Sequence, residues 1–260
     1  TQYDTFNFTF YAYQLDEERT TLFQEPEVRQ ALFYGLDREA LVQAIRFGIG
    51  EVAVGTMPVP SWAYNPDAIE RNYDYDPERA RELLDEAGWV EGDDGIRERD
   101  GERFAFEIYT NAGNEVREQY VTVMQEQWRE IGVECTPQTE EWNAFLDRIT
   151  SSMDFEMFLV GFSWGVDPHQ ESMWRSDGGF NMNGYNNSEV DDLLDQALET
   201  TDQEERTEIY TEMQNIVLED LPSPILDFPQ GIYGVNQRIR NIFPNDVDFT
   251  VNAHEWWVES

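Results

Sequence analysis

The sequence predicts an α/β fold with a mixed sheet flanked by helices, because capped amphipathic helices alternate along it with short apolar segments of strand type. The chain has 260 residues, enough to bury a sizeable core as one large or two small domains. Hydrophobic residues make up 40% of it and aromatic residues 14%, which indicates a folded protein and excludes a disordered acidic tail.

Several helices are marked by their caps and by apolar spacing. Asp76 and Pro77 supply an N-cap and a first helical residue, the apolar residues that follow recur at helical spacing, and Gly88 ends the segment. Ser188 and Asp202 are expected to cap two later helices. The same spacing predicts further helices around residues 28–32, 41–45 and 116–128.

Strand-like segments lie between these helices. Aromatic or apolar residues alternate with others at 6–10 and 104–108. Short apolar runs at 133–136, 155–162 and 224–228 have the character of buried strands. Helices that alternate with such runs are typical of a largely parallel or mixed sheet.

Acidic residues dominate the charge. The chain holds 54 Asp and Glu against 17 basic residues, all of them arginine, for a formal net charge of −37 at pH 7. Nucleic acids are excluded as partners, because their phosphates would be repelled, and the charge also speaks against docking on an anionic membrane surface. The carboxylates are spread along the whole chain, so we interpret them as the acidic surface of a halophilic protein, which keeps it soluble at high salt.

No sequence motif of a catalytic centre is present. The HExxH, GxSxG, P-loop and GxGxxG patterns are missing, and there are only two histidines. Cys135 is the only cysteine, which excludes an internal disulfide and a multi-cysteine zinc site, and we interpret it as a buried small hydrophobe. We therefore expect a protein that is not an enzyme and has no cofactor or metal. A carboxylate-dependent hydrolase of the glycosidase type is the alternative, and a pure interaction module is a third interpretation.

Several motifs occur in one characteristic order. Residues 27–32 read EVRQAL, 35–41 read GLDREAL, 75–89 read YDPERARELLDEAGW, and 93–97 read DDGIR. The smaller matches that follow are Ile131-Gly132-Val133, Trp142, Phe155, Gly161, Asp167-Pro168, Asn183, Tyr185, Glu189-Val190-Asp191 and Leu221-Pro222. Over roughly residues 6–228 the chain thus resembles family 5 of the extracellular solute-binding proteins, the peptide-, dipeptide- and nickel-binding components of ABC importers.

The resemblance implies one lobe of a two-lobed clamp, of the periplasmic-binding-protein type II kind. Residues 1–235 would form the C-terminal ligand-binding lobe, with a hinge strand near the N-terminus. Residues 236–260 would be a return segment that belongs to, or packs towards, the N-terminal lobe. Arg29, Asp37 and Arg38 of the first motifs are expected to seat two helices through salt bridges and caps.

The resemblance also implies a location and partners. The protein would be a monomer that delivers its solute to the permease subunits of an ABC transporter. It would lie outside the cytoplasm at the cell surface, anchored through a segment that precedes residue 1. Within the chain itself, the first ten residues lack the pattern of a signal peptide, and no apolar run approaches the roughly 18 residues that cross a bilayer.

The segment after the apolar run 155–162 is the best candidate for a ligand site. Ligands of α/β folds sit at the carboxyl ends of strands, and the family's equivalent loop lines the cleft. Phe162, Ser163 and Trp164 are the first candidates, since a flat aromatic face and a hydroxyl suit a small polar solute. The weaker candidates in this and a later loop are Gly165, Asp167, Asn183 and Tyr185.

The loop departs from that of peptide-binding members. There, an aromatic residue is shortly followed by an aspartate that pairs with the peptide's α-amino group. Gly165 or Val166 takes that place here, and Asp167 belongs to an Asp-Pro turn, which puts a peptide ligand in doubt. An oligopeptide, a sugar and a metal chelate therefore all stay open as the solute.

Overall fold

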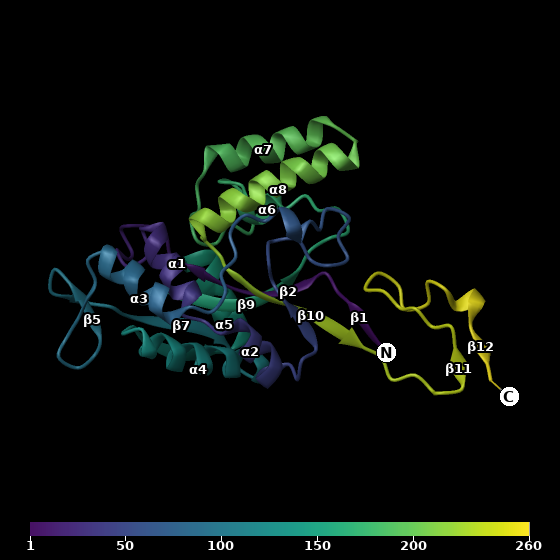
Figure 1. Cartoon of the computed structure of the whole chain (residues 1–260), viewed down its shortest axis with the longest axis horizontal. Helices are drawn as coiled ribbons and strands as arrows, with labels where there is room; N and C mark the ends of the chain where they lie inside the picture. The colour runs from purple at the N-terminus through teal and green to yellow at the C-terminus, as the bar shows by residue number, and fades with distance from the viewer. Residues whose placement is uncertain (260) are drawn as a thin grey trace.

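The computed structural model describes residues 1–259, and its centre is one mixed sheet of seven strands (Figure 1). The strand order is β1-β10-β2-β9-β7-β8, and β3 pairs with β10. Strands β7, β8 and β9 run parallel, whereas β2 is antiparallel to both of its neighbours. The strands of this sheet are β1 (Gln2–Asp4), β2 (Asn7–Tyr13), β3 (Gly50–Val52), β7 (Ala105–Asn111), β8 (Glu134–Glu140), β9 (Met157–Ser163) and β10 (Ile225–Ile232).

Helices cover both faces of this sheet, as the alternation in the sequence predicts. The pair α7 and α8 lies on one side, and α2 and α4 lie on the other (Figure 1). The helices are α1 (Pro26–Tyr34), α2 (Arg38–Ile45), α3 (Pro77–Glu86), α4 (Glu115–Glu130), α5 (Trp142–Asp147), α6 (Glu171–Trp174), α7 (Ser188–Glu199) and α8 (Gln203–Asp220). The shorter elements are η1 (Pro66–Ala68), η2 (Arg148–Ser152), η3 (Ala253–Glu255), β4 (Val90–Glu91), β5 (Arg97–Arg99), β6 (Glu102–Arg103), β11 (Ile239–Arg240) and β12 (Trp257–Val258).

The predicted capping residues lie at the starts of their helices, except in α7, where the cap is one residue earlier than predicted. The Asp76 carboxylate accepts a hydrogen bond from the backbone N–H of Arg79, and the Asp202 carboxylate caps α8. In α7 the cap is Asn187, whose Oδ1 accepts from two backbone N–H groups, and Ser188 is the first helical residue. The side-chain oxygen of Asn187, one residue before Ser188, already satisfies two of the free N–H groups, so the predicted serine cap was wrong by one position.

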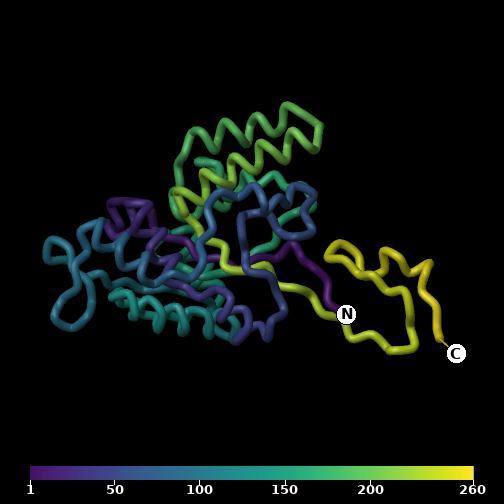
Figure 2. Tube along the Cα trace, in the orientation of Figure 1, coloured from purple at the N-terminus to yellow at the C-terminus, as the bar shows by residue number. Residues whose placement is uncertain are grey.

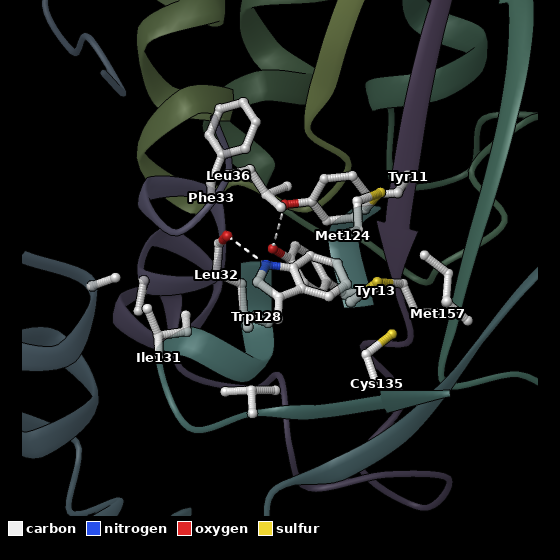
Figure 3. Close-up of a cluster of buried hydrophobic side chains, with 14 of the residues drawn as sticks. Tyr11, Tyr13, Leu32, Phe33, Leu36, Met124, Trp128, Ile131, Cys135 and Met157 are labelled. Atoms are coloured by element: carbon white, nitrogen blue, oxygen red, sulfur yellow. Dashed lines mark hydrogen bonds between the residues drawn. The ribbon is translucent and has the colours of Figure 1, made fainter. Parts of the chain in front are cut away.

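Strand β2 contributes to the core on both faces of the sheet. Its alternating side chains place Tyr11 and Tyr13 in one hydrophobic cluster and Phe8 and Phe10 in the other. In the first cluster the indole N–H of Trp128, from α4, donates to the carbonyl oxygen of Leu32 at 2.8 Å (Figure 3). Because side chains pack on both faces of β2, the N-terminal end of this strand is held firmly in place.

Cys135 lies in the first of these clusters, where Figure 3 shows its sulfur among apolar side chains. Burial raises the pKa of its thiol well above the ordinary value, so the neutral form persists. The structure confirms Cys135 as a buried small hydrophobe.

Two buried arginines hold the helices of the first motifs, as predicted, but they do so without salt bridges. The Arg29 guanidinium donates to the carbonyl oxygens of Phe23 at 2.6 Å and Asp220 at 2.7 Å. Arg38 donates to the carbonyl oxygens of Ala53 and Tyr73, and burial lowers its pKa to about 10. No carboxylate among residues 1–259 forms an ion pair with either side chain; the expected salt bridges are therefore replaced by carbonyl contacts.

Strand β1 lies at one side of the sheet, beside the end of β10. Strand β1 pairs antiparallel with the end of β10, from Gln2 opposite Ile232 to Asp4 opposite Gln230. Beyond β10 the chain extends away from the body and forms the small β11–β12 pair (Figure 2). This segment exposes several large apolar side chains, namely Phe243, Val247, Val251, Trp257 and Val258. The boundary expected at residue 236 stays a prediction.

Candidate functional site

A pocket of about 430 Å³ lies at one edge of the sheet. It is bounded by the end of β9, the beginning of β2 and the first turn of α4, so it occupies the carboxyl-end position where α/β folds bind ligands. Its lining residues are Asn7, Phe8, Thr9, Arg46, Asn114, Val116, Arg117, Gly161, Phe162, Ser163 and Pro229. We call this concavity the strand-end pocket.

Arg117 forms one wall of the strand-end pocket from the first turn of α4. Its guanidinium donates to Asn111 Oδ1 at 2.6 Å and to the carbonyl oxygen of Gly161 at 3.2 Å, so it bridges the ends of β7 and β9. Gly161 leaves the room that this requires, because a Cβ atom there would lie 3.1 Å from Arg117 Nη2. The bridge fixes the direction of the guanidinium beside the pocket.

Arg46 forms a second basic wall, at the end of α2. Its guanidinium pairs with the carboxylate of Asp227, which is fully buried on β10, and donates to Thr9 Oγ1 at 2.6 Å. Burial raises the pKa of Asp227, and the attraction of Arg46 opposes that rise. Without this partner the ionised carboxylate would be buried and unpaired, which is strongly destabilising.

The strand-end pocket is therefore electropositive in a strongly acidic chain. Two arginines line it and no Asp or Glu does, while Asp227 lies beneath Arg46. Burial lowers the pKa of Arg117, and the neighbouring charge of Arg46 lowers it further. Both effects oppose the cationic form of Arg117, and an anion in the pocket would relieve them.

The sequence-predicted residues Phe162 and Ser163 line the pocket, whereas Trp164 does not and packs on β2. The Trp164 ring stacks on Phe8 with centroids 4.5 Å apart, and its indole N–H donates to the carbonyl oxygen of Thr56 at 3.2 Å. The ring is half-buried, so one face is already used for packing. Gly165 is exposed next to it.

The other predicted residues have partners within the protein. Asp167 Oδ1 accepts hydrogen bonds from the backbone N–H of His169 and from the Arg206 guanidinium. Asn183 is buried and donates to the carbonyl oxygen of Pro222, and the Tyr185 hydroxyl donates to Asp220. None of these three side chains lines the strand-end pocket, and a ligand role for them stays a prediction.

Sequence reasoning missed the two arginines of the pocket. Arg46 and Arg117 stand far apart in the sequence, and only the closed sheet brings them together. One local signal was available: Arg117 lies in the first turn of a predicted helix, where the helix dipole disfavours a cation. Such a placement is a reason to look for a functional role.

A second, larger concavity of about 850 Å³ lies beside α8. We call it the acidic groove, because six of its lining residues are carboxylates: Glu70, Glu189, Glu208, Glu212, Glu219 and Asp220. Within residues 1–259, no group of three or more His, Cys, Asp or Glu side chains is arranged to hold a metal ion. No helix in the same range is long and apolar enough to span a membrane.

The family described as "Bacterial extracellular solute-binding proteins, family 5 Middle" matches residues 1–184. The oligopeptide-binding protein AppA of Bacillus subtilis is 32% identical over 253 residues, which cover 95% of this chain and 47% of the relative. The heme-binding protein A of Haemophilus influenzae is 33% identical over 225 residues, or 84% of this chain and 39% of the relative.

Solved structures share the fold at similar coverage. AppA of Bacillus subtilis in complex with a nonapeptide superposes with a TM-score of 0.86 at 29% identity, over 100% of this chain and 52% of that one. NikZ of Campylobacter jejuni in complex with Ni(L-His) gives 0.80 at 26% identity, over 98% of this chain and 52% of that one. The chain thus spans about half the length of the relatives it matches, which confirms the predicted single lobe. It belongs to the family 5 bacterial extracellular solute-binding proteins.

Proposed function

We propose that this lobe forms one wall of the cleft of a solute-binding protein that delivers a small solute to the permease of an ABC importer. The observation that carries the proposal is the strand-end pocket, a concave surface at the carboxyl ends of the sheet in a chain of this family. The paired strands β1 and β10 lie side by side at one side of the same sheet, and we take this pair as the hinge between two lobes.

An oligopeptide or a metal chelate is the solute we propose. The relatives described above are named for oligopeptide and heme binding, and the solved structures contain a nonapeptide and Ni(L-His). The sugar expected as a third possibility has no support among them and is not retained. Family membership also decides against the hydrolase alternative, because this family consists of binding proteins.

We propose that the protein works outside the cytoplasm and at high salt concentration. Among residues 1–259, Asp227 is the one Asp or Glu that is buried, so nearly all the negative charge faces solvent, as expected for a halophilic protein. The family's extracellular character supports a location outside the cytoplasm. Attachment to the membrane, contact with a permease and the monomeric state stay predictions.

A thermal-shift screen tests the proposed function. A two-lobed protein that contains this chain is heated in molar salt with a nonapeptide pool and with Ni²⁺–L-histidine. A recognised solute at a concentration of 100 Kd should stabilise it by about 2.7 kcal/mol. The 260-residue chain alone is the control and should respond weakly, because closure supplies the second wall. Turnover of peptides or oligosaccharides, without a stabilising probe, would contradict the proposal.

A further inference from the structure

The sequence contains two copies of a short motif that the proposed binding function does not use. They are Asn7-Phe8-Thr9 and Asn186-Asn187-Ser188, and both fit the pattern Asn-x-Ser/Thr in which x is not proline. In proteins outside the cytoplasm this pattern, called a sequon, marks an asparagine that can be glycosylated on its side-chain amide. So short a pattern also occurs by chance, and only an asparagine that an enzyme can reach is a candidate.

The sequon at Asn186 lies in an open loop. Asn186 and Ser188 are both exposed, in the connection that leads into α7 (Figure 1). Among residues 1–259, neither the backbone nor the side chain of Asn186 has a hydrogen-bond partner. Gly184, two residues earlier, has no atom within 4 Å of the place where a Cβ atom would lie, so the loop has space around it. The amide of Asn186 is therefore accessible from solvent.

The middle residue of this sequon carries the structural role, which leaves the other two free. Asn187 is the N-cap of α7, and its Oδ1 accepts hydrogen bonds from two backbone N–H groups of the first turn. Its Nδ2 donates to the Asp220 carboxylate at 2.8 Å. The backbone of Asn187 is extended, with φ −145° and ψ 111°, so Asn186 stands outside the helix. A modification of Asn186 would disturb neither the cap nor the contact with Asp220.

The sequon at Asn7 is in the opposite situation. Its three residues belong to β2, which is paired with β9 from Asn7 opposite Ser163 onwards. Thr9 is 3% exposed, and its hydroxyl already accepts a hydrogen bond from Arg46 at 2.6 Å. An enzyme could reach this threonine only by opening the sheet. A glycan on Asn7 would also lie in the strand-end pocket, which this residue lines.

We propose that Asn186 is an N-glycosylation site and that Asn7 is not. The inference rests on the proposed location outside the cytoplasm. The donor would be a lipid-linked oligosaccharide, and a glycosyltransferase of the producing cell would catalyse the transfer. Asn187 and Glu189 line the acidic groove, so the glycan would add a bulky polar group at the rim of this groove.

The transfer step is a substitution at the first sugar of the donor. The Nδ2 atom of Asn186 attacks C1 of that sugar, and the Nδ2–C1 bond forms as the bond between C1 and the oxygen of the lipid phosphate breaks. The lipid phosphate leaves with the electron pair, and the amide gives up one proton to a base of the transferase. No oxidation or reduction takes place, and Asn186 becomes a secondary amide.

Peptide mapping by mass spectrometry tests the proposal on the full-length protein from the cells that produce it. The cytoplasmic and extracytoplasmic fractions are first separated, and the protein is purified from each. In the extracytoplasmic fraction we expect the peptide that contains Asn186 to be heavier by the mass of whole sugar residues, which fragmentation releases as sugar oxonium ions. The peptide that contains Asn7 should have its unmodified mass.

Substitutions within the sequon assign the glycan to this motif while the cap at Asn187 stays in place. Asn186→Gln and Ser188→Ala should each abolish the added mass. The matched variant Ser188→Thr keeps the hydroxyl and should retain it. A glycan that persists in Ser188→Ala would show that the attachment does not depend on the sequon, and would overturn the inference.

The remaining outcomes separate the inference from the location on which it rests. An unmodified Asn186 peptide in the extracytoplasmic fraction would overturn the inference and leave the location intact. Protein recovered only from the cytoplasmic fraction would contradict the proposed location and the inference together. A glycan on Asn7 would overturn the claim that the folded structure selects between the two sequons. Because the mapping uses the unmodified sequence, it is decisive even if a variant fails to fold.

Discussion

Two concave surfaces of this lobe carry opposite charge. The strand-end pocket is lined by Arg46 and Arg117 without a carboxylate, whereas the acidic groove is lined by six carboxylates and no basic residue. The pocket is built on strand ends above a buried ion pair, and the groove borders solvated helices. The negative net charge of the chain therefore predicts the charge of its solvent-facing surface. It does not predict the charge of the pocket, which depends on the side chains that the folded sheet brings together.

The largest expected effect comes from the ion pair beneath the pocket. Asp227→Asn leaves Arg46 without its buried partner and should lower the free energy of unfolding by about 3–5 kcal/mol, measured by chemical denaturation. The control in the acidic groove is Glu219→Gln, whose partner Arg71 is exposed, with an expected loss below about 1 kcal/mol. If the two variants lose the same free energy of unfolding, the ion pair beneath the strand-end pocket is no more stabilising than the exposed pair at the acidic groove, which would contradict this prediction.

The aromatic contact beside the pocket ranks second. Trp164→Ala removes a half-buried ring from Phe8 and a hydrogen bond to Thr56, which should destabilise the fold by about 2–3 kcal/mol in thermal unfolding. Trp142→Ala is the matched control: Trp142 is 41% exposed, and a smaller loss is expected. If the two substitutions lower the stability by the same amount, Trp164 supports the edge of the pocket no more than an exposed tryptophan would.

The pH dependence of a surface pair gives a smaller effect with a defined sign. Hydrogen bonding to Arg148 holds the pKa of Glu140 below its ordinary value of 4.5, so this pair stabilises the fold above that pH and is lost as the pH falls through the lower folded value. Glu140→Gln should therefore be less stable than the wild type by about 1 kcal/mol or less at pH 7, since the pair is partly solvated, and no less stable at about pH 3.

Unfolding of the wild type and of Glu140→Gln is followed from about pH 3 to 7, the range in which carboxylates change charge. A difference between the two proteins that does not change with pH would contradict the role of the ionised Glu140.

The smallest expected effect lies in the acidic groove. Glu208 and Glu212 are one turn apart on α8, where like charges repel, so Glu212→Gln should stabilise the fold by about 0.2–0.5 kcal/mol at low salt. The gain should vanish at about 3 M KCl, where screening is nearly complete. The wild type itself should become more stable between about 0.1 and 3 M KCl, and equal stability at both concentrations would defeat the halophilic interpretation.

Local chemistry made most of the fold predictable. The caps at Asp76 and Asp202 and the apolar spacing after them are properties of adjacent residues, so they predicted α3 and α8 directly. The apolar run at 155–162 predicted β9 almost to its bounds. The shift from Ser188 to Asn187 shows the precision of such signals, because two good capping residues stood side by side and only the backbone geometry chose between them.

The site was predictable only in part, because it depends on contacts between distant segments. Phe162 and Ser163 were predicted because they follow a buried strand, and they line the strand-end pocket, although a ligand role for them stays a prediction. Arg46 and Arg117 were missed, because their approach requires α2, α4 and the sheet to close. Asp227 did give a signal in the sequence, because it is the single acidic residue within the apolar run at 224–228. A buried carboxyl group must either be neutral or have a cation beside it.

The packing of strand β2 has a consequence for the rigidity of the strand-end pocket. Phe8 and Thr9 of this strand form part of the pocket floor, and the strand is packed by aromatic side chains from both faces of the sheet. The floor can loosen only when both cores open, so amide exchange along Asn7–Tyr13 should require global unfolding. We therefore expect a solute bound in the proposed site to meet a surface already in its bound shape.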